Sequence, residues 1–263
     1  MKCKEGTERR GSARSFHRHS LKTSLSLEEQ RKMDPQERLF FEAVERGDKH
    51  TMARCLQGNK AVNVNARNMM GRSAIQIAVD NENVEIVELL LKQRGIQIAD
   101  ALLYAVREGV YRIVEMLIDH PTISAGMLGS DWCWHKSSKN SPDYAQDISP
   151  IILAAHCNQF EILQLLLSRG ARIERPHALT CSCHKCSTNI KYDSLRHSLL
   201  RIHTYRALAS PAWISLTSSD PVLTAFKLSW EVEHLASREN EFKVLVVNYT
   251  VLITMNGNIG FTF

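Results

Sequence analysis

Four segments of the chain repeat the same order of apolar and polar positions: residues 40–56, 75–91, 102–118 and 151–167. Each segment has a small residue that serves as an origin for counting, at Ala43, Ala78, Ala105 and Ala154. Apolar residues recur nine and thirteen positions later, at Met52, Val87, Val114, Leu163, Leu56, Leu91, Ile118 and Leu167. The position twelve residues after each origin holds Cys55, Leu90, Leu117 and Leu166. This pattern predicts two short amphipathic helices joined by a polar turn in each segment.

A helix pair of this size leaves one apolar face uncovered, so stacked copies are its stable arrangement, and the sequence predicts an all-α solenoid. The units resemble ankyrin repeats. The stretch "GRSAIQIA" at residues 71–78 stands where that family has G-x-T-P-L-H-x-A, and the fourth unit keeps Ser149-Pro150. We expect four degenerate repeats over residues 33–176. Because the spacing of the units is uneven, the third is predicted to lack its β-turn hairpin, and residues 121–146 are predicted to be an insertion.

Two pairs of side chains in this region allow specific expectations. Trp132 and Trp134, in the insertion, either mark a partner site or fold back on the stack, and the sequence leaves both alternatives open. Cys55 and Cys157 fall within the predicted repeat helices. A buried free thiol is the default expectation for both cysteines.

Charge and motif content argue against two classes of function. The net charge is +5, and residues 1–32 alone hold nine Lys and Arg against four Glu, so the rest of the chain is neutral. A nucleic-acid partner is not expected, because phosphate binding needs a basic surplus on the folded surface. An enzyme is not expected either, since the sequence has no Gly-rich phosphate loop and no G-x-S-x-G elbow. Residues 1–32 are too polar to form a core and are predicted to be a disordered basic tail.

The densest candidate chemistry lies in "HALTCSCHKC", which packs three of the seven cysteines and two of the eleven histidines into residues 177–186. The spacing H-x3-C-x-C-x2-C supplies four donors that suit a tetrahedral, structural Zn²⁺ with no position left for water: His177, Cys181, Cys183 and Cys186. A metal-free cysteine cluster remains an alternative, as does a disulfide, although an odd cysteine count disfavours the disulfide. His184 is a substitute ligand, but His177 is preferred because it follows Pro176 at the end of the fourth repeat.

After this loop, residues 192–243 are predicted to form several helices. Ser210-Pro211 ends one helix, and Asp220-Pro221 caps and starts another. In the last of these helices, Leu223, Phe226 and Trp230 recur at i, i+3 and i+7, and we expect this stripe to face the core.

A family resemblance rests on the repeats together with "RPH", "CSCHKC", "DSLRHS", "YRALASP", "SSDPVLTAFKLSWE" and "ENEFK". These stretches resemble the TRPC-type transient receptor potential channels, especially invertebrate ones, from about residue 35 to residue 243. The resemblance implies a zinc-binding loop at 177–192, with the four donors above as ligands. It also implies a linker-helix domain, the transient receptor ion channel domain, at 193–243.

For function, the resemblance implies the cytosolic N-terminal part of a calcium-permeable cation channel in the plasma membrane, store- or receptor-operated downstream of phospholipase C. The implied partners are other subunits of a homo- or heterotetramer and cytosolic regulatory proteins. Residues 244–263 depart from the family pattern, and their apolar run of twelve residues, 244–255, is shorter than the roughly 20 that a membrane helix needs. We expect no membrane span, a chain truncated before the membrane helices, and a cytosolic location for the fragment alone. The alternative is a soluble ankyrin and zinc adaptor without a pore.

Overall fold

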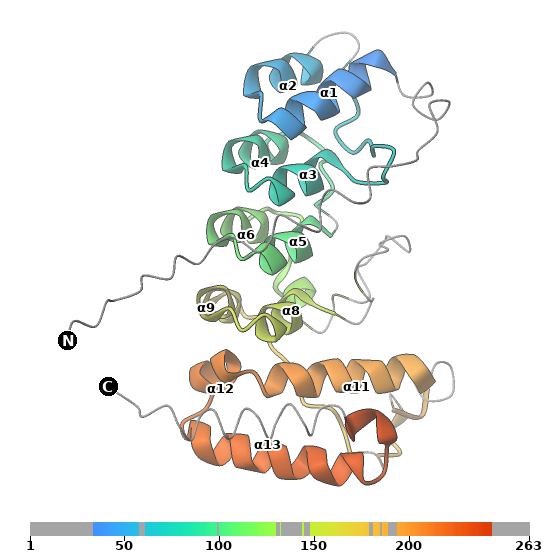
Figure 1. Ribbon diagram of the computed structural model, residues 1–263, viewed down its shortest axis with the longest axis vertical. Helices are drawn as coiled ribbons and strands as arrows, with labels where there is room; N and C mark the ends of the chain where they lie inside the picture. Colours follow the sequence, from blue (N-terminus) through green and yellow to red (C-terminus); the bar gives the residue numbers. More distant parts are fainter. Residues whose placement is uncertain are drawn as a thin grey trace, which may run out of the picture.

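The fold is a stack of short helix pairs that ends in three further helices (Figure 1). The structure is a computed structural model, and it describes residues 34–57, 61–98, 100–129, 132, 144, 148–178, 181–184, 186–188 and 194–243. The expected tails at 1–32 and 244–263, and Trp134, lie outside the described residues. Within the described ranges the regular elements are helices, and an isolated bridge between Arg67 and Ser73 is the one β contact.

Four helix pairs make up the stack: α1 (Pro35–Arg46) with α2 (Lys49–Leu56), α3 (Ala74–Asp80) with α4 (Val84–Leu91), α5 (Ala101–Glu108) with α6 (Tyr111–Ile118), and α8 (Pro150–His156) with α9 (Phe160–Ser168). The first helices of successive pairs pack on one another, and so do the second helices. The all-α ankyrin solenoid predicted from the sequence is therefore confirmed.

The repeated apolar positions form one continuous core along the stack. The four origin alanines are buried, and so are the residues nine and twelve positions after them, from Met52 and Cys55 in the first repeat to Leu163 and Leu166 in the fourth. At offset thirteen the residue is buried only in the third repeat, and in the others it packs at the edge of the core. Each pair thus buries its stripe against the next pair, as a solenoid requires.

A left-handed residue reverses the chain between the two helices of every repeat. Four positions after each origin, φ is 75° at Gly47, 54° at Glu82, 76° at Gly109 and 54° at Asn158. Gly adopts this conformation freely and Asn tolerates it, which explains the residue at three of the four turns. The next residue caps the second helix in the first two repeats, where Asp48 and Asn83 accept backbone N–H bonds.

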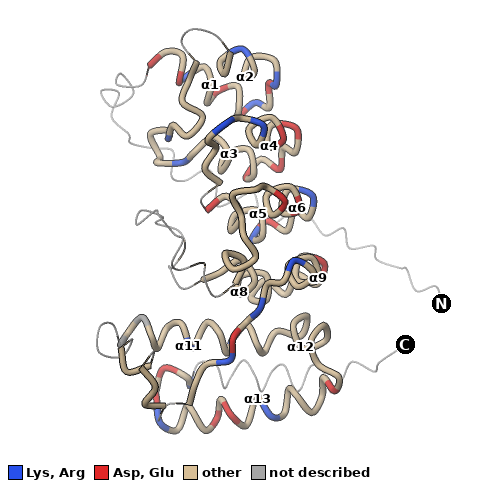
Figure 2. The backbone as a smooth tube through the Cα atoms, turned by 180° about the vertical axis from the view of Figure 1, so that it is seen from behind, with Lys and Arg blue, Asp and Glu red and all other residues tan. Residues whose placement is uncertain are grey.

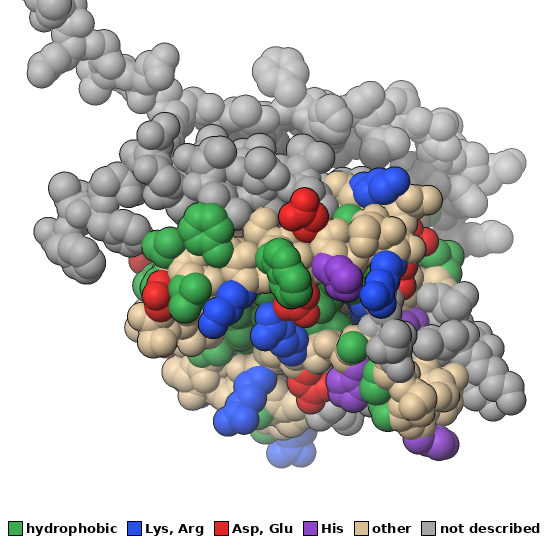
Figure 3. Space-filling model, turned by 90° about the horizontal axis from the view of Figure 1, so that it is seen from below, with side chains coloured by type: hydrophobic (Ala, Val, Ile, Leu, Met, Phe, Trp, Pro, Cys, Tyr) green, Lys and Arg blue, Asp and Glu red, His purple; other side chains and the backbone are tan. Residues whose placement is uncertain are grey.

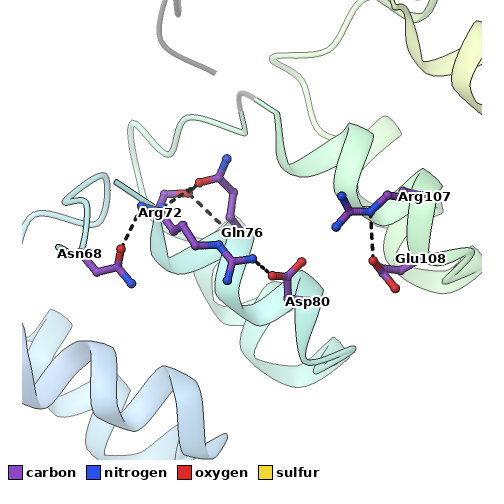
Figure 4. Close-up of polar contacts among 7 residues, drawn as sticks. Asn68, Arg72, Gln76, Asp80, Arg107 and Glu108 are labelled. Atoms are coloured by element: carbon purple, nitrogen blue, oxygen red, sulfur yellow. Dashed lines mark hydrogen bonds and ion pairs between the residues drawn. The ribbon is translucent and has the colours of Figure 1, made fainter. Parts of the chain in front are cut away.

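The second repeat keeps a hairpin that is fixed to its first helix by polar contacts (Figure 4). Asn68 Oδ1 accepts the backbone N–H groups of Met70 at 3.0 Å and Arg72 at 2.9 Å. The Arg72 guanidinium then pairs with Asp80, a buried carboxylate at the last position of α3. A buried charge is tolerated only with a partner. This ion pair therefore links the hairpin to the C-terminal end of α3.

Charges of both signs are interspersed along the molecule (Figure 2). Among the residues that the structure describes, two ion pairs join neighbouring repeats: Lys49 of α2 lies 3.5 Å from Glu85 of α4, and Arg169 pairs with Asp119. These exposed pairs contribute little stability individually. The surface of the stack carries both positive and negative side chains.

Three helices follow the repeats: α11 (Ser194–Leu208), α12 (Pro211–Thr217) and α13 (Pro221–Ala236), with a short 3₁₀ turn, η3 (Asn240–Phe242), after them. The predicted breaks are confirmed, since Ser210 caps α12 and Asp220 caps α13, each followed by Pro at the first helical position. α11 packs on α8 and α12 packs on α9, so this hairpin continues the stack as a further helix pair (Figure 1).

The expected core-facing stripe of α13 is wrong. Leu223, Phe226 and Trp230 are 48%, 56% and 71% exposed. The helix instead buries Leu228, Val232 and Leu235 in a second core with Tyr205 and other residues of α11, α12 and η3. α13 therefore carries two apolar faces, and the described neighbours cover only one of them.

Two other expectations are settled by burial. Trp132, which follows the 3₁₀ turn η2 (Ala125–Leu128), is buried in the core of the stack, so it folds back rather than marking an open partner site. Cys55 is buried as expected, but Cys157 is exposed. Cys157 stands at the C-cap of α8, one residue before the left-handed Asn158, where the chain turns away from the core.

Candidate metal centre

The residues that form the candidate metal centre converge immediately after the last repeat. Nδ1 of His177 lies 3.5 Å from Sγ of Cys181, 3.4 Å from Sγ of Cys183 and 3.4 Å from Sγ of Cys186. The four donor atoms all lie within 4.8 Å of one another, and they form the group of potential metal ligands found among the described residues. His184, the substitute ligand considered from the sequence, is exposed and is not part of this group.

Local backbone contacts fold the loop around His177. The N–H of Cys181 donates to the carbonyl of Ala178 at 2.9 Å, and the N–H of Ser187 donates to the carbonyl of Cys183 at 2.9 Å. The N–H of Cys186 reaches Sγ of Cys183 at 3.4 Å. These tight turns bring residues separated by up to nine positions to a single point.

The spacing of the donors can be compared with a tetrahedral zinc ion. With Zn–N near 2.0 Å and Zn–S near 2.3 Å, a tetrahedral angle places nitrogen and sulfur about 3.5 Å apart. The three separations measured from His177 Nδ1, at 3.4–3.5 Å, match that edge. Three thiols and one imidazole are also the soft and borderline donors that zinc prefers, so the residues present fit this metal.

The thiols of this cluster do not ionise alike. Hydrogen bonds, the first of them from the backbone N–H of Cys186, lower the pKa of Cys183 to about 6. Burial and the neighbouring thiols raise the pKa of Cys186 to about 11. The cluster thus accommodates one negative charge and resists a second, because two thiolates at this distance repel each other. A divalent cation among them removes that repulsion, which is why such clusters release protons when they bind metal.

Glu231 of α13 connects the segment that precedes the loop to the helices that follow it, a role that sequence reasoning missed. Its carboxylate accepts from Arg175 Nη2 at 2.7 Å and from the Tyr205 hydroxyl at 2.7 Å. Burial and this carboxylate raise the pKa of Tyr205, so the phenol remains a hydrogen-bond donor. Residues 175, 205 and 231 show no common spacing in the sequence, and only the fold brings them together.

Comparison with known families defines the class of the chain. Residues 40–128 match the model of ankyrin repeats in three copies, residues 146–178 match a further ankyrin repeat, and residues 181–243 match the model named transient receptor ion channel II. An ankyrin stack that leads into this region is the arrangement on which the resemblance to TRPC-type channels was based.

Individual relatives carry the same likeness over most of the chain. This chain is 55% identical to a transient-receptor-potential-like protein of Caenorhabditis elegans over 215 residues, which cover 80% of this chain and 21% of the relative. It is 45% identical to a protein of the same name from Drosophila melanogaster, over 79% of this chain and 19% of the relative. With the human short transient receptor potential channel 3 it shares 43% identity, over 84% of this chain and 24% of the relative.

These matches confirm the resemblance stated from the sequence: the chain is related to the N-terminal region of TRPC-type transient receptor potential channels. The chain spans only about a fifth of the length of the curated relatives it matches. Among the described residues, no helix has both the length and the apolar character needed to cross a bilayer.

Proposed function

We propose that this chain is the cytosolic N-terminal part of a calcium-permeable, store- or receptor-operated cation channel linked to phospholipase C, and that it serves subunit assembly and partner docking. The likeness to channel proteins supports this proposal, and one structural observation carries it: the open apolar face of α13. The proposal includes the division of the folded chain into repeats (33–176), a metal loop (177–192) and linker helices (193–243). It also includes a place at the cytosolic face of the plasma membrane.

The open face of α13 consists of Val222, Leu223, Phe226 and Trp230, each about half exposed or more. Phe226 and Trp230, together with Lys227 and Glu231, line a shallow hollow of about 400 Å³. Figure 3 views this end of the molecule, where hydrophobic side chains lie open between charges of both signs. A cluster of large apolar side chains left in water is a recurrent sign of a protein interface. The mixed charges around it favour a protein partner over an anionic lipid surface, which attracts a basic rim.

The docking role can be tested with full-length channel subunits. The chain is coexpressed with a full-length TRPC-type relative, and association is measured by pull-down while current is measured by whole-cell recording. We expect the chain to bind the channel and reduce its current by occupying places in the tetramer. The double substitution Phe226→Ser and Trp230→Ser should reduce binding at least tenfold, because the apolar contact area disappears.

A matched control distinguishes specific binding through this surface from nonspecific association of exposed apolar side chains. Tyr111→Ser removes an exposed aromatic side chain from α6, on the repeat stack, and should leave association unchanged. If the chain does not associate with any channel subunit, the assembly role is rejected and the free-standing ankyrin and zinc adaptor becomes the better account.

We further propose that His177, Cys181, Cys183 and Cys186 hold one structural Zn²⁺. The support is the donor chemistry and the match of the measured separations to a tetrahedral edge. When bound, the metal supplies a cross-link between the end of the last repeat and the loop, and it stabilises all three sulfurs as thiolates. With four protein donors, no coordination position is left for a substrate, so the role is structural.

Elemental analysis and X-ray absorption test the zinc site directly. Protein purified without chelator should contain close to one zinc per chain, and the absorption fine structure should fit three sulfur neighbours near 2.3 Å and one nitrogen near 2.0 Å. A chain that contains no zinc under these conditions, or a fit with an oxygen neighbour from water, contradicts the site.

A further inference from the structure

The joint between the last repeat and the linker helices combines apolar packing, which includes Ala207 and Ala212, with polar bonds from one turn. α11 lies on α8 and α12 lies on α9, and two polar residues around the end of α8 bond to this hairpin. Asn158 Oδ1 accepts the Ser210 hydroxyl at 3.1 Å and the backbone N–H of Ala212 at 2.9 Å. The Ala212 N–H is one of the unpaired donors in the first turn of α12, so Asn158 caps a helix that belongs to the next unit.

His156, the last residue of α8, makes the second bond across the joint. Its Nε2–H donates to the backbone carbonyl of His203 on α11 at 2.9 Å, and the two imidazole rings lie 5.6 Å apart. The ring of His156 is largely removed from water in this position. Burial lowers the pKa of His156 to about 4, and the positive charge of Arg206 on α11 acts in the same direction.

The other elements packed against α8 do not supply a compensating charge at this position. α5 contributes Arg107 and Glu108, whose side chains pair with each other at 3.1 Å. Glu161 on α9 is exposed, and α12 has no ionisable side chain. The hydrogen bond to the carbonyl of His203 survives protonation, because an imidazolium still donates. A charged His156 is therefore disfavoured by lost hydration and by repulsion from α11, and not by a broken bond.

We propose that His156 and Asn158 form a latch that holds the linker helices on the last repeat, and that protonation of His156 weakens it. Asn158 supplies attachment at any pH, because its side chain does not titrate. His156 adds a pH-dependent part. The geometry of the channel-related linker region relative to the repeats thereby becomes sensitive to acidification of the surrounding solution.

The sign and size of the effect follow from linkage. In the closed joint the pKa of His156 is about 4, and in an opened joint the ring returns to its ordinary value of 6.5. A lowered pKa means that the closed state is fully favoured above pH 6.5 and loses stability as the pH falls toward 4. With these values, the ratio of closed to open joints falls about 3-fold from pH 7 to pH 6 and about 20-fold from pH 7 to pH 5.

Hydrogen exchange of the full chain, read by mass spectrometry on peptides of α12, measures opening of the joint. The matched variant is His156→Gln, whose amide can still donate to the His203 carbonyl but cannot be protonated. Comparing both proteins at each pH cancels the intrinsic pH dependence of exchange, and it also cancels any loss of metal from the cysteine loop. We expect equal protection at pH 7.5 and about 20-fold less protection in the unsubstituted chain at pH 5.

A second variant separates the two parts of the latch. Asn158→Ala should lower the protection of α12 at every pH, because the cap is lost, while leaving the pH dependence as steep as in the unsubstituted chain. Peptides of α1 and α2 serve as an internal reference that neither variant should change. If the chain and His156→Gln lose protection in parallel as the pH falls, or if Asn158→Ala abolishes the pH dependence, the proposal is overturned.

Discussion

Leu90 offers a direct test of the repeat core. It lies on α4 at offset twelve and is 0% exposed, within the core that runs through all four repeats. Leu90→Ala removes three carbon atoms, and at about 0.8 kcal/mol for each buried methylene the lost transfer free energy is about 2.4 kcal/mol. The neighbouring repeats restrict collapse, so a cavity term adds to this, and we expect a total destabilisation of about 3–4 kcal/mol.

Leu39 on α1 provides the control, since the same chemical change occurs there at a side chain that is 45% exposed. Leu39→Ala loses about half of the transfer term and leaves no cavity, so we expect about 1 kcal/mol. The exposed turn residue Asn81, whose amide donates to the Glu45 carbonyl at 3.3 Å, should lose no more than about 1 kcal/mol on replacement by Ala. Urea unfolding of the full chain, followed by far-ultraviolet circular dichroism at fixed zinc concentration, gives the three values. Equal losses for Leu90→Ala and Leu39→Ala would refute the assignment of the repeat core.

Two further substitutions examine the region after the repeats. Cys186→Ser, at the most buried of the three loop thiols, should reduce bound zinc from about one per chain to a small fraction. His184→Ala should leave the zinc content unchanged. Elemental analysis of the two variants measures this difference. Arg201→Met should destabilise the linker helices by about 2 kcal/mol in thermal unfolding, because the carboxylate of Glu239, now 3.3 Å from Arg201 Nη1, loses its charged partner but keeps partial contact with water. A loss below 1 kcal/mol would mean that this pair contributes no more than an exposed one.

Much of the fold could be predicted from the sequence, because apolar spacing and helix-capping residues depend only on neighbours in the chain. The helix pairs follow from apolar offsets that repeat within some seventeen residues, and the helix starts at Pro211 and Pro221 follow from a capping side chain next to Pro. The donors of the metal loop also lie within ten residues, so their convergence needs only tight turns. In each case the physical cause acts between neighbours in the chain, and spacing alone reports it.

Burial at the joint and beyond it was decided by the tertiary structure. The spacing of Leu223, Phe226 and Trp230 places them on one face of α13, but a spacing does not say which face meets a neighbour. The second core contains side chains from the opposite face of α13, because η3 and α11 pack against that face. In the same way, the local sequence predicts only that Asn158 is a turn residue. It caps a helix across the joint because the fold places α12, more than fifty residues later in the chain, beside it. Contacts between segments distant in sequence carry no periodic signal, so the fold alone reveals which apolar face remains open and which turn becomes a joint.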